Sequence, residues 1–365
     1  MKIAIVTDWL TNYGGAESVI SAFHDLFPDA PVYTTIYRPE KMRELGKLKD
    51  VRTTWLNKLP LKHQWLLGQM PTAIEMMDLD EFDVVLSSCH SVSKGVITKP
   101  STLHVCYCHT PMRYAWESWD FETRLKKFPS ILHPLIRKQI GKIREWDFAA
   151  AQRVDKYIAN STYTGSQIKK YYNRSSDVIY PPVHTEKFKP VTNPKGDYYF
   201  SIGRLIPYKK FDLIVETFNQ LGLPLKIAGI GPDFNKIRKM AKKNVEILGH
   251  VDDKTLTELY ANSKALLFPQ IEDAGIVPLE AMASGRPVIA LNRGGSLDTM
   301  IENKTGVFFD EQTVEGLSDA VKRFEKMSFD PKFIRKHAEQ FDVEVFKDKI
   351  MGYVEKEWNI FSHSV

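Results

Sequence analysis

Residues 268–290 read FPQIEDAGIVPLEAMASGRPVIA, and this stretch decides the fold class of the second half of the chain. The residues Lys264–Phe268, which lead into it, predict a short buried strand. Pro278 suits the first position of a helix and Gly285 suits its end, after which Pro287–Ala290 predicts another strand. A strand, a turn, a helix and a strand in this order are typical of a parallel α/β sheet.

Two glutamates, Glu272 and Glu280, lie on either side of the turn in this stretch. The backbone N–H groups at the start of the helix, those of Gly275, Ile276 and Val277, have no acceptor within it, and the helix dipole favours an anion there. A phosphate would fit this place. An isolated glutamate at position 280 would more often be an ordinary exposed acid, so the assignment depends on the other motifs.

The same alternation of strands and helices runs through the whole chain, with helices expected at Ala16–Leu26, Ser161–Tyr172 and Val345–Phe361. The first half predicts strands at Lys2–Thr7, Pro31–Ile36, Val51–Thr54, Phe82–Ser87, Leu103–Tyr107, Val154–Asn160 and Val178–Tyr180. The second half predicts strands at Tyr198–Gly203, Leu225–Ala228, Val245–Leu248, Ala265–Phe268, Val288–Ala290 and Gly306–Phe309.

The chain has 365 residues, more than one hydrophobic core usually serves, so we expect two domains. A proline-rich segment around residues 181–197 marks the boundary. We predict an N-terminal domain at 1–183, a linker at 184–196, a C-terminal domain at 197–344, and a C-terminal helix at 345–365 that crosses back to the N-terminal domain. Each domain is predicted to be Rossmann-like and doubly wound, and the two are expected to face each other across a cleft.

The composition is that of a soluble globular enzyme, with 43% apolar and 26% charged residues. Three cysteines, Cys89, Cys106 and Cys108, form no disulfide framework and predict reduced thiols. The N-terminal strand is too short for a secretory signal, and no apolar run approaches the roughly 18 residues of a membrane span. We therefore predict a cytoplasmic protein, with a peripheral position at the inner face of the plasma membrane as a further possibility.

The net charge is +5, and the excess lies in residues 1–190, with 26 lysines and arginines against 20 acids. No acid interrupts Arg124–Arg144, where isoleucines and leucines separate the basic residues. Such a pattern suits an anionic membrane surface or an acceptor, but equally a helix packed on its own domain. No nucleic-acid motif accompanies it, so nucleic acid is not expected as a partner. The candidate patch consists of Arg124, Lys126, Lys127, Arg137, Lys138, Lys142 and Arg144.

Two cations follow the first predicted strand of the second domain, Arg204 just after Gly203, and Lys209. A guanidinium fork and an ammonium group are what a diphosphate leaving group needs, because charge grows on it as its bond breaks. A solvated basic loop is the alternative. In the first domain, Gly14-Gly15 follows the first strand, where a close approach to a ligand is as plausible as a plain turn.

His109 follows the Leu103 strand, at the edge of the sheet where ligands bind in open α/β folds. Its ring could bind a sugar hydroxyl or a phosphate, although single histidines are more often structural. The other histidines, His90, His104 and His250, lack comparable support. No cluster has the spacing of metal ligands, so we expect neither a metal nor a cofactor.

Several segments resemble the retaining GT-B glycosyltransferases of family four. They are GRLIPYKK, AGIGPD, LGHV, IEDAGIVPLEAMASGRPVIA and GGSLDTMIENKTGVFF in the second domain, with the E-x7-E motif at Glu272 and Glu280. YCHTPMRYAWE, ANSTYTGSQIKKYY and VIYPPVHTEKF look like the first domain and linker of the bacterial polysaccharide and O-antigen mannosyltransferases of that family. Two positions depart from the pattern: Ala274, where the family often has Phe, and His184, where Asp is common.

The resemblance implies roles for the residues of the second domain. Arg204 and Lys209 would hold the diphosphate of a nucleotide sugar, Glu280 the ribose hydroxyls, and Glu272 the donor sugar. In the first domain, His109 would lie near the C6 hydroxyl of the sugar and the reacting centre. The full set implied to be catalytic is His109, Arg204, Lys209 and Glu272. The donor-binding set is Gly14, Gly15, Gly203, Arg204, Lys209, Val251, Glu272, Ala274, Gly275, Ile276, Val277 and Glu280.

The implied activity is retaining, metal-independent transfer of a sugar, mannose from GDP-mannose in the first instance. The acceptor would be a glycan or a polyprenyl-linked glycan in cell-surface polysaccharide synthesis. A UDP-sugar donor carrying glucose, GlcNAc or galactose is the alternative within this class. A nucleotide-sugar epimerase on the same fold is the alternative from a different class.

Overall fold

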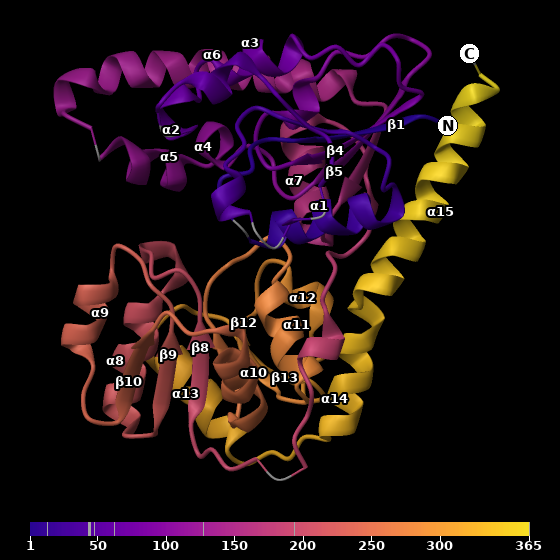
Figure 1. The fold of residues 1–365 in the computed structure, drawn as a ribbon. Coiled ribbons are helices and arrows are strands. Elements are labelled where there is room, and N and C mark those ends of the chain that lie inside the picture. Colours follow the sequence, from indigo (N-terminus) through magenta and orange to yellow (C-terminus); the bar gives the residue numbers. More distant parts are fainter. Residues whose placement is uncertain are drawn as a thin grey trace. The chain divides into compact units, whose positions relative to one another are not determined.

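The computed structural model describes residues 1–12, 14–42, 45–46, 48–61, 63–126, 128–192 and 194–364. The chain divides into two compact units, and Figure 1 shows their elements. Unit 1 comprises residues 1–181 together with 346–365, and unit 2 comprises residues 182–345. Each unit is built around its own parallel sheet.

Unit 1 contains a seven-stranded sheet in the order β3-β2-β1-β4-β5-β6-β7. All of its neighbouring strands pair in parallel. The central strands are buried along their whole length, as expected where helices cover both faces. The strands are β1 (Ile3–Thr7), β2 (Val32–Thr34), β3 (Val51–Thr53), β4 (Val84–Cys89), β5 (Leu103–Cys108), β6 (Lys156–Ala159) and β7 (Asp177–Val178).

Helices cover both faces of this sheet (Figure 1). On one face, Cys106 of β5 packs with Ile168 and Tyr172 of α7. On the other face, Tyr107 contacts Phe23 of α1 and Phe346 of α15. The helices are α1 (Gly15–Leu26), α2 (His63–Leu66), α3 (Met70–Glu75), α4 (Arg113–Trp116), α5 (Ser118–Leu125), α6 (His133–Arg153), α7 (Thr162–Tyr172) and α15 (Val343–Ser362), with short 3₁₀ turns at η1 (Pro39–Lys41), η3 (Trp55–Lys58), η4 (Ser93–Gly95) and η5 (Ser130–Leu132).

Unit 2 contains a six-stranded parallel sheet in the order β10-β9-β8-β11-β12-β13. This order runs outward in both directions from β8, which is the pattern of a Rossmann fold. The strands are β8 (Tyr199–Ile202), β9 (Leu225–Ala228), β10 (Val245–Gly249), β11 (Leu266–Phe268), β12 (Val288–Leu291) and β13 (Gly306–Phe309).

Helices again cover both faces. Phe218 of α8 and Phe324 of α13 contact Tyr199 of β8 on one face, while Tyr260 of α10 contacts Phe200 on the other. The helices are α8 (Phe211–Leu221), α9 (Phe234–Met240), α10 (Asp253–Asn262), α11 (Ile276–Ala283), α12 (Ser296–Thr299), α13 (Val314–Phe324) and α14 (Pro331–Ala338), with 3₁₀ turns at η6 (Thr185–Lys187), η7 (Pro207–Lys209) and η8 (Glu339–Phe341).

The predicted strands and helices are found with small shifts in their bounds. β9 and β13 begin and end where expected, and Ser161 caps α7 by accepting a hydrogen bond from the N–H of Thr164. One prediction about α11 was wrong: the helix begins at Ile276, so Pro278 is its third residue. Gly275 adopts a left-handed conformation with φ +72° as its N-cap, and the helix can therefore start earlier than the proline indicates.

A buried ion pair joins helix α6 of unit 1 to the turn η4. Lys94 and Asp147 are both almost completely inaccessible to solvent and contact each other. The ammonium group also donates to the carbonyl of Ser91 at 2.7 Å. Trp116 Nε1 and the Tyr172 hydroxyl both donate to Oδ2 of Asp147, at 2.7 and 2.8 Å. The residues that follow β4 are thereby fixed to the helices behind them.

Replacing Lys94 by Met should lower the free energy of unfolding by about 3–5 kcal/mol, because it leaves the Asp147 carboxylate buried without its cation. Chemical denaturation of the variant and the wild type measures this. The exposed Lys99 offers the control, since Lys99→Met should change stability by less than about 0.5 kcal/mol. Equal stabilities for the two variants would contradict the role of the buried pair.

Candidate functional site

The strand order of unit 2 reverses direction between β8 and β11. In open α/β sheets, the loops that leave the carboxyl ends of two such strands diverge, and ligands bind in the crevice between them. The loop after β8 carries Gly203, Arg204 and Lys209, and the loop after β11 carries Glu272. The fold therefore places the predicted phosphate-binding and sugar-binding residues at the same reversal point.

Lys209 and Glu272 meet across this point. Lys209 Nζ lies 3.1 Å from Oε1 of Glu272, and the hydroxyl of Tyr208 donates to the same oxygen at 3.3 Å. Both charged side chains are mostly buried. Arg204 is exposed and makes no ion pair among the described residues. Its guanidinium can therefore bind a further anion without first breaking a bridge.

Gly294 and Gly295 pack closely against the loop after β11. The predicted site did not include them. The backbone N–H of Gly295 donates to the carbonyl of Glu272 at 2.9 Å. A Cβ atom at position 295 would lie 2.3 Å from the carbonyl oxygen of Asp273, and one at Gly294 would lie 2.6 Å from that of Glu272. Only glycine allows this approach. The pair Gly294-Gly295 in the sequence was the signal available for it.

The beginning of α11 lies next to this loop. Ala274 is buried, and the backbone N–H groups of Gly275, Ile276 and Val277 open the helix. The first N–H groups of a helix have no acceptor within it. Gly275, the N-cap, has no side chain that could supply one. The binding of an anion at this helix start stays a prediction.

Glu280 lies one turn further along α11 and contacts a different partner. The hydroxyl of Tyr260 in α10 donates to its Oε2 at 2.7 Å. Burial raises the pKa of Glu280 to about 7, and the hydrogen bond from Tyr260 opposes this only in part. The two glutamates of the motif therefore have different partners, a lysine for Glu272 and a tyrosine for Glu280. Val251, two residues beyond β10, is half-buried.

Unit 1 has a reversal point of its own, between β1 and β4. Asp8 directly follows β1 and His90 directly follows β4, and the Nδ1 atom of His90 lies 2.9 Å from Oδ2 of Asp8. Neither residue was predicted as functional. The position of each, directly after a strand, was the same signal that identified His109.

His109 directly follows β5, the next strand of the sheet. Its Nε2 atom lies 2.7 Å from the hydroxyl of Ser88, and its ring centroid lies 6.4 Å from that of His90. Burial, and then the charge of His90, lower the pKa of His109 to about 3. The ring is therefore uncharged at neutral pH and retains one acceptor nitrogen.

The turn at Gly14 and Gly15 begins α1, with Gly14 as its N-cap. Glu17, the third residue of this helix, lies in its first turn and is mostly buried. Burial raises the pKa of its carboxyl group.

The basic segment is divided between the end of α5, the turn η5 and the first half of α6. Arg124 pairs with Asp120 at 2.6 Å, and Arg137 pairs with Glu122 at 2.7 Å, so acids from α5 neutralise two of the arginines. The guanidinium of Arg144 donates to a backbone carbonyl. Lys127 lies outside the described residues. The remaining predicted cations, Lys126, Lys138 and Lys142, are exposed.

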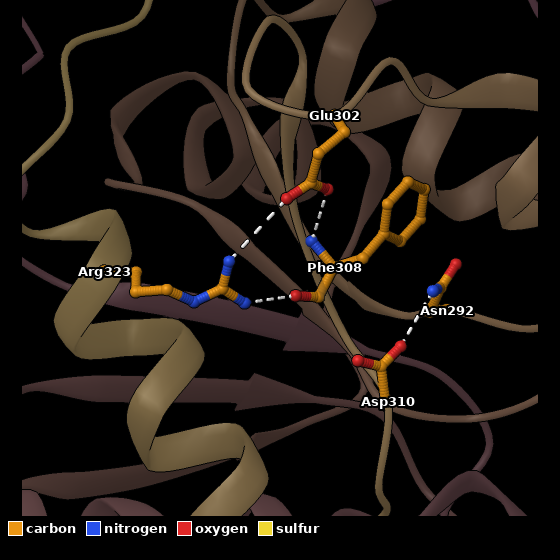
Figure 2. Close-up of a pocket in the computed structure, with 5 residues that line it drawn as sticks. All are labelled: Asn292, Glu302, Phe308, Asp310 and Arg323. Carbon is orange, nitrogen blue, oxygen red and sulfur yellow. Dashed lines mark hydrogen bonds and ion pairs between the residues drawn. The ribbon is translucent and has the colours of Figure 1, made fainter.

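A polar pocket of about 490 Å³ lies elsewhere in unit 2, along the edge strand β13 (Figure 2). Glu302 accepts from the N–H of Phe308 at 2.8 Å, and Arg323 donates to the carbonyl of the same residue. Asn292 and Asp310, at the ends of β12 and β13, hydrogen-bond to each other at 2.8 Å. These contacts occupy the free backbone groups of an edge strand, which explains the pocket without a ligand.

No helix in the described ranges is both long and apolar enough to cross a bilayer. Among the same residues, no group of three or more His, Cys, Asp or Glu side chains is arranged to hold a metal ion. The expectation of metal-independent chemistry stays a prediction.

Comparison with known families covers nearly the whole chain. Residues 13–187 match the family Glycosyltransferase Family 4, and residues 182–341 match Glycosyl transferases group 1. The first match lies in unit 1 apart from its last residues, and the second lies in unit 2.

Individual relatives are mannosyltransferases. The chain is 28% identical over 323 residues to alpha-1,3/1,6-mannosyltransferase ALG2 of Mus musculus, which covers 76% of this chain and 74% of the mouse protein. It is 30% identical over 192 residues to the GDP-mannose-dependent alpha-(1-6)-phosphatidylinositol monomannoside mannosyltransferase of Mycobacterium tuberculosis, which covers 44% of this chain and 50% of that protein.

Solved structures share the fold at low sequence identity. Anabaena Alr3699/HepE in complex with UDP superposes with a TM-score of 0.74 at 15% identity, over 98% of this chain and 100% of that chain. Sucrose-phosphate synthase from Thermosynechococcus elongatus gives a TM-score of 0.72 at 16% identity, over 99% and 100% of the two chains. These similarities confirm the predicted architecture of two Rossmann-like domains.

The raised pKa of Glu280 predicts an unusual pH dependence of stability. In the folded state its pKa is about 7, above the value near 4.5 of an unfolded glutamate, so the folded state binds the proton more tightly. The contribution of Glu280 therefore lowers the free energy of unfolding as the pH rises from 4.5 to about 7. Glu280→Gln should be more stable than the wild type at pH 8 and should lose this advantage at pH 4.

Thermal unfolding of the ligand-free protein at pH 4, 6 and 8 measures this difference. The exposed Glu258, on the neighbouring helix α10, provides a control in the variant Glu258→Gln. A stability difference between Glu280→Gln and the wild type that stays constant across the three pH values would refute the assignment.

Proposed function

Because this chain belongs to the group 1 and family 4 glycosyltransferases, we propose that it is a retaining mannosyltransferase that uses GDP-mannose as its donor. Its acceptor is a glycan or a polyprenyl-linked glycan, and the reaction serves cell-surface polysaccharide synthesis. The mannosyltransferase names of its relatives support the sugar, and the GDP-mannose-dependent mycobacterial relative supports the base.

The observation that carries the proposal is the meeting of Lys209 and Glu272 at the reversal point of unit 2, with the exposed Arg204 on the same loop as Lys209. Lys209 and Arg204 bind the diphosphate of the donor. The N–H groups at the start of α11 add to this binding, because the helix dipole favours negative charge there. Glu272 then binds hydroxyls of the donor sugar, and Glu280 accepts hydrogen bonds from the ribose.

The chemistry needs no covalent contribution from the protein. A hydroxyl oxygen of the acceptor forms a bond to the anomeric carbon of mannose while the bond from that carbon to the phosphate oxygen breaks. The bond electrons leave with GDP, and the hydroxyl proton passes to the departing phosphate on the same face of the sugar. Arg204 and Lys209 stabilise the negative charge that develops on the diphosphate, and such electrostatic stabilisation commonly contributes more to catalysis than any other effect.

A UDP-sugar is the second candidate donor. Two structures with the same fold, those of Anabaena Alr3699/HepE, hold UDP and UDP-glucose. The diphosphate and ribose contacts proposed above would serve either nucleotide, so the choice depends on residues around the base and the sugar.

We also propose that the segment from η5 into α6 binds an anionic membrane surface. Ile131 is 85% exposed and Leu135 is 58% exposed, so both apolar side chains are available to a surface. Leu135, Lys138 and Lys142 are spaced by three and four residues, so they lie along one stripe of the helix. Apolar side chains flanked by lysines suit the surface of a bilayer that contains acidic lipids, where lipid-linked acceptors reside.

Removing the two side chains that are proposed to bind the diphosphate, Arg204 and Lys209, tests the donor site. Arg204→Ala and Lys209→Ala should each lower kcat by about 100-fold to 1,000-fold, because charge on the leaving group loses its stabilisation. The exposed Arg238 on α9 supplies the control variant Arg238→Ala, which should keep full activity. Nucleotide release is measured for GDP-mannose and for UDP-glucose, UDP-GlcNAc and UDP-galactose, with and without acceptor, alongside thermal unfolding.

We expect GDP-mannose to be the preferred donor. Preference for a UDP-sugar would select the second candidate, and full activity of Arg204→Ala in a folded protein would remove the diphosphate assignment.

The membrane surface is tested by flotation of the protein with liposomes. Ile131→Asp combined with Leu135→Asp should abolish flotation with vesicles that contain phosphatidylglycerol, because two apolar contacts are replaced by charges that acidic lipids repel. Ile360 of α15 is similarly exposed, and Ile360→Asp should float like the wild type. Identical flotation of all three proteins, or flotation that ignores acidic lipid, would contradict the proposed surface.

A further inference from the structure

A second pocket lies within unit 1, between the helices α4 and α5 on one side and the first half of α6 on the other. Its volume of about 260 Å³ is close to the lower end of the roughly 300–1,000 Å³ of small-molecule sites. A pocket of this size suits a group about as large as one sugar ring. The lining residues that matter below are Glu117, Phe121, Glu122, Arg137, Gly141 and Arg144.

The two walls of this pocket are tied to each other. Trp116 Nε1 of α4 donates to Oδ2 of Asp147 on α6 at 2.7 Å, and Asp147 in turn contacts the buried Lys94. The guanidinium of Arg144 donates to the carbonyl of Ala115 and lies 5.9 Å from the centroid of the Trp116 ring. The pocket therefore has a fixed shape before any ligand binds, which lowers the entropic cost of binding.

The charges that line the pocket balance. Two terminal nitrogens of Arg137 donate to the two carboxylate oxygens of Glu122, at 2.7 and 3.1 Å. Arg144 and Glu117 add a second guanidinium and a second carboxylate. A charged ligand would meet groups of its own sign as well as of the opposite sign, so the pocket favours neither an anion nor a cation.

A neutral ligand with many hydroxyl groups fits this lining. Guanidinium groups only donate hydrogen bonds and carboxylates only accept them, whereas a hydroxyl does both. A sugar ring can therefore use both kinds of group at once. The half-buried side chains of Phe121 and Ile140 supply apolar surface for the carbon-bound hydrogens of such a ring.

The carboxylate of Glu117 is held by a buried amide. Gln167 of α7 is 6% exposed, and its Nε2 atom donates to Oε1 of Glu117 at 3.1 Å. In the part of the chain that the structure describes, the other atom of this amide, Oε1, accepts no hydrogen bond. Buried acceptors are rarely left without a donor, so a water molecule or a ligand hydroxyl is needed to complete this group.

On the basis of the proposed function, we propose that the pocket between α5 and α6 is a sugar-binding subsite, which takes one neutral sugar residue of the acceptor glycan. Its polar groups bind the hydroxyls of that residue, and its apolar side chains contact the ring. A phosphate group of a lipid or of a lipid-linked acceptor is disfavoured there, because it would face the carboxylates of Glu117 and Glu122.

The variant Gly141→Leu tests the subsite by filling it. A Cβ atom at position 141 would meet no described atom within 4 Å, and leucine favours a helix more than glycine does. The variant should therefore fold while its side chain occupies the pocket. Gly352 of α15 has equally open surroundings, so Gly352→Leu is the matched control.

Binding is measured by saturation-transfer NMR with the methyl α-glycosides of mannose, glucose, galactose and GlcNAc, without donor or acceptor. At least one glycoside should bind the wild type with a Kd on the order of 1 mM. Gly141→Leu should weaken this binding by about tenfold or more, whereas Gly352→Leu should not. Glu117→Gln should also weaken it by about tenfold, because a carboxylate acceptor is lost. Any glycoside bound in unit 2 is common to all four proteins and cancels in the comparison.

Transfer kinetics show whether the bound sugar belongs to the acceptor. Gly141→Leu should raise the KM for the acceptor by about tenfold or more and leave the KM for the donor unchanged, because the subsite contacts the acceptor alone. A merely structural effect of the substitution would change both constants.

Unchanged glycoside binding in a folded Gly141→Leu protein would overturn the proposal, as would an unchanged KM for the acceptor. Inorganic pyrophosphate serves as the anionic probe. If pyrophosphate and none of the glycosides lost affinity in Gly141→Leu, the pocket would be an anion site and the proposal would be wrong. The binding measurement needs no transfer, so a protein that binds a glycoside in the pocket yet transfers no sugar from any donor would refute the proposed function separately.

Discussion

In a parallel α/β sheet, the residues that directly follow neighbouring strands must leave the sheet at the same edge, and this constraint determines where the charged groups of the protein meet. At the reversal point of unit 2 it brings Lys209 to within 3.1 Å of Glu272. At the reversal point of unit 1 it brings His90 to within 2.9 Å of Asp8. Segments far apart in the chain thereby form two charged sites, one for each sheet.

These sites contain charges that a simple scaffold would avoid. Burial of an acid without a cation disfavours its charged form, which is the reason for the raised pKa of Glu280. Such a residue costs stability in the absence of a ligand, and the cost is offset when hydroxyl groups bind the carboxylate. Asp8 is buried as well, yet its backbone hydrogen bonds and His90 hold it in the charged form. At Glu280, burial therefore outweighs the favourable contacts of the carboxylate, whereas at Asp8 the favourable contacts outweigh burial.

Most of the fold could be predicted from the sequence, because buried parallel strands are short continuous apolar runs with turns between them. β9 and β13 were located to the residue. The start of α11 was not, because the left-handed Gly275 lets the helix begin before Pro278.

The functional site could be predicted only in part. The family resemblance pointed to Lys209 and Glu272, whereas the ion pair between them follows from the order of the strands. Asp8 and His90 each directly follow a strand, but their ion pair depends on the pairing of β1 with β4, which nothing local to either residue indicates. Two arginines of the basic segment, Arg124 and Arg137, pair with acids that lie before the segment on α5.

The proposed chemistry makes a definite statement about stereochemistry. If the acceptor attacks on the face that the diphosphate leaves, the α configuration of mannose in GDP-mannose is kept in the product. The most direct measurement is the one-bond coupling between C1 and H1 of the transferred mannose, observed by NMR in the isolated product. We expect the coupling constant of an α-linked mannose. The value of a β-linked mannose would show inversion and would contradict a mechanism in which Arg204 and Lys209 stabilise a leaving group on the same face as the incoming acceptor.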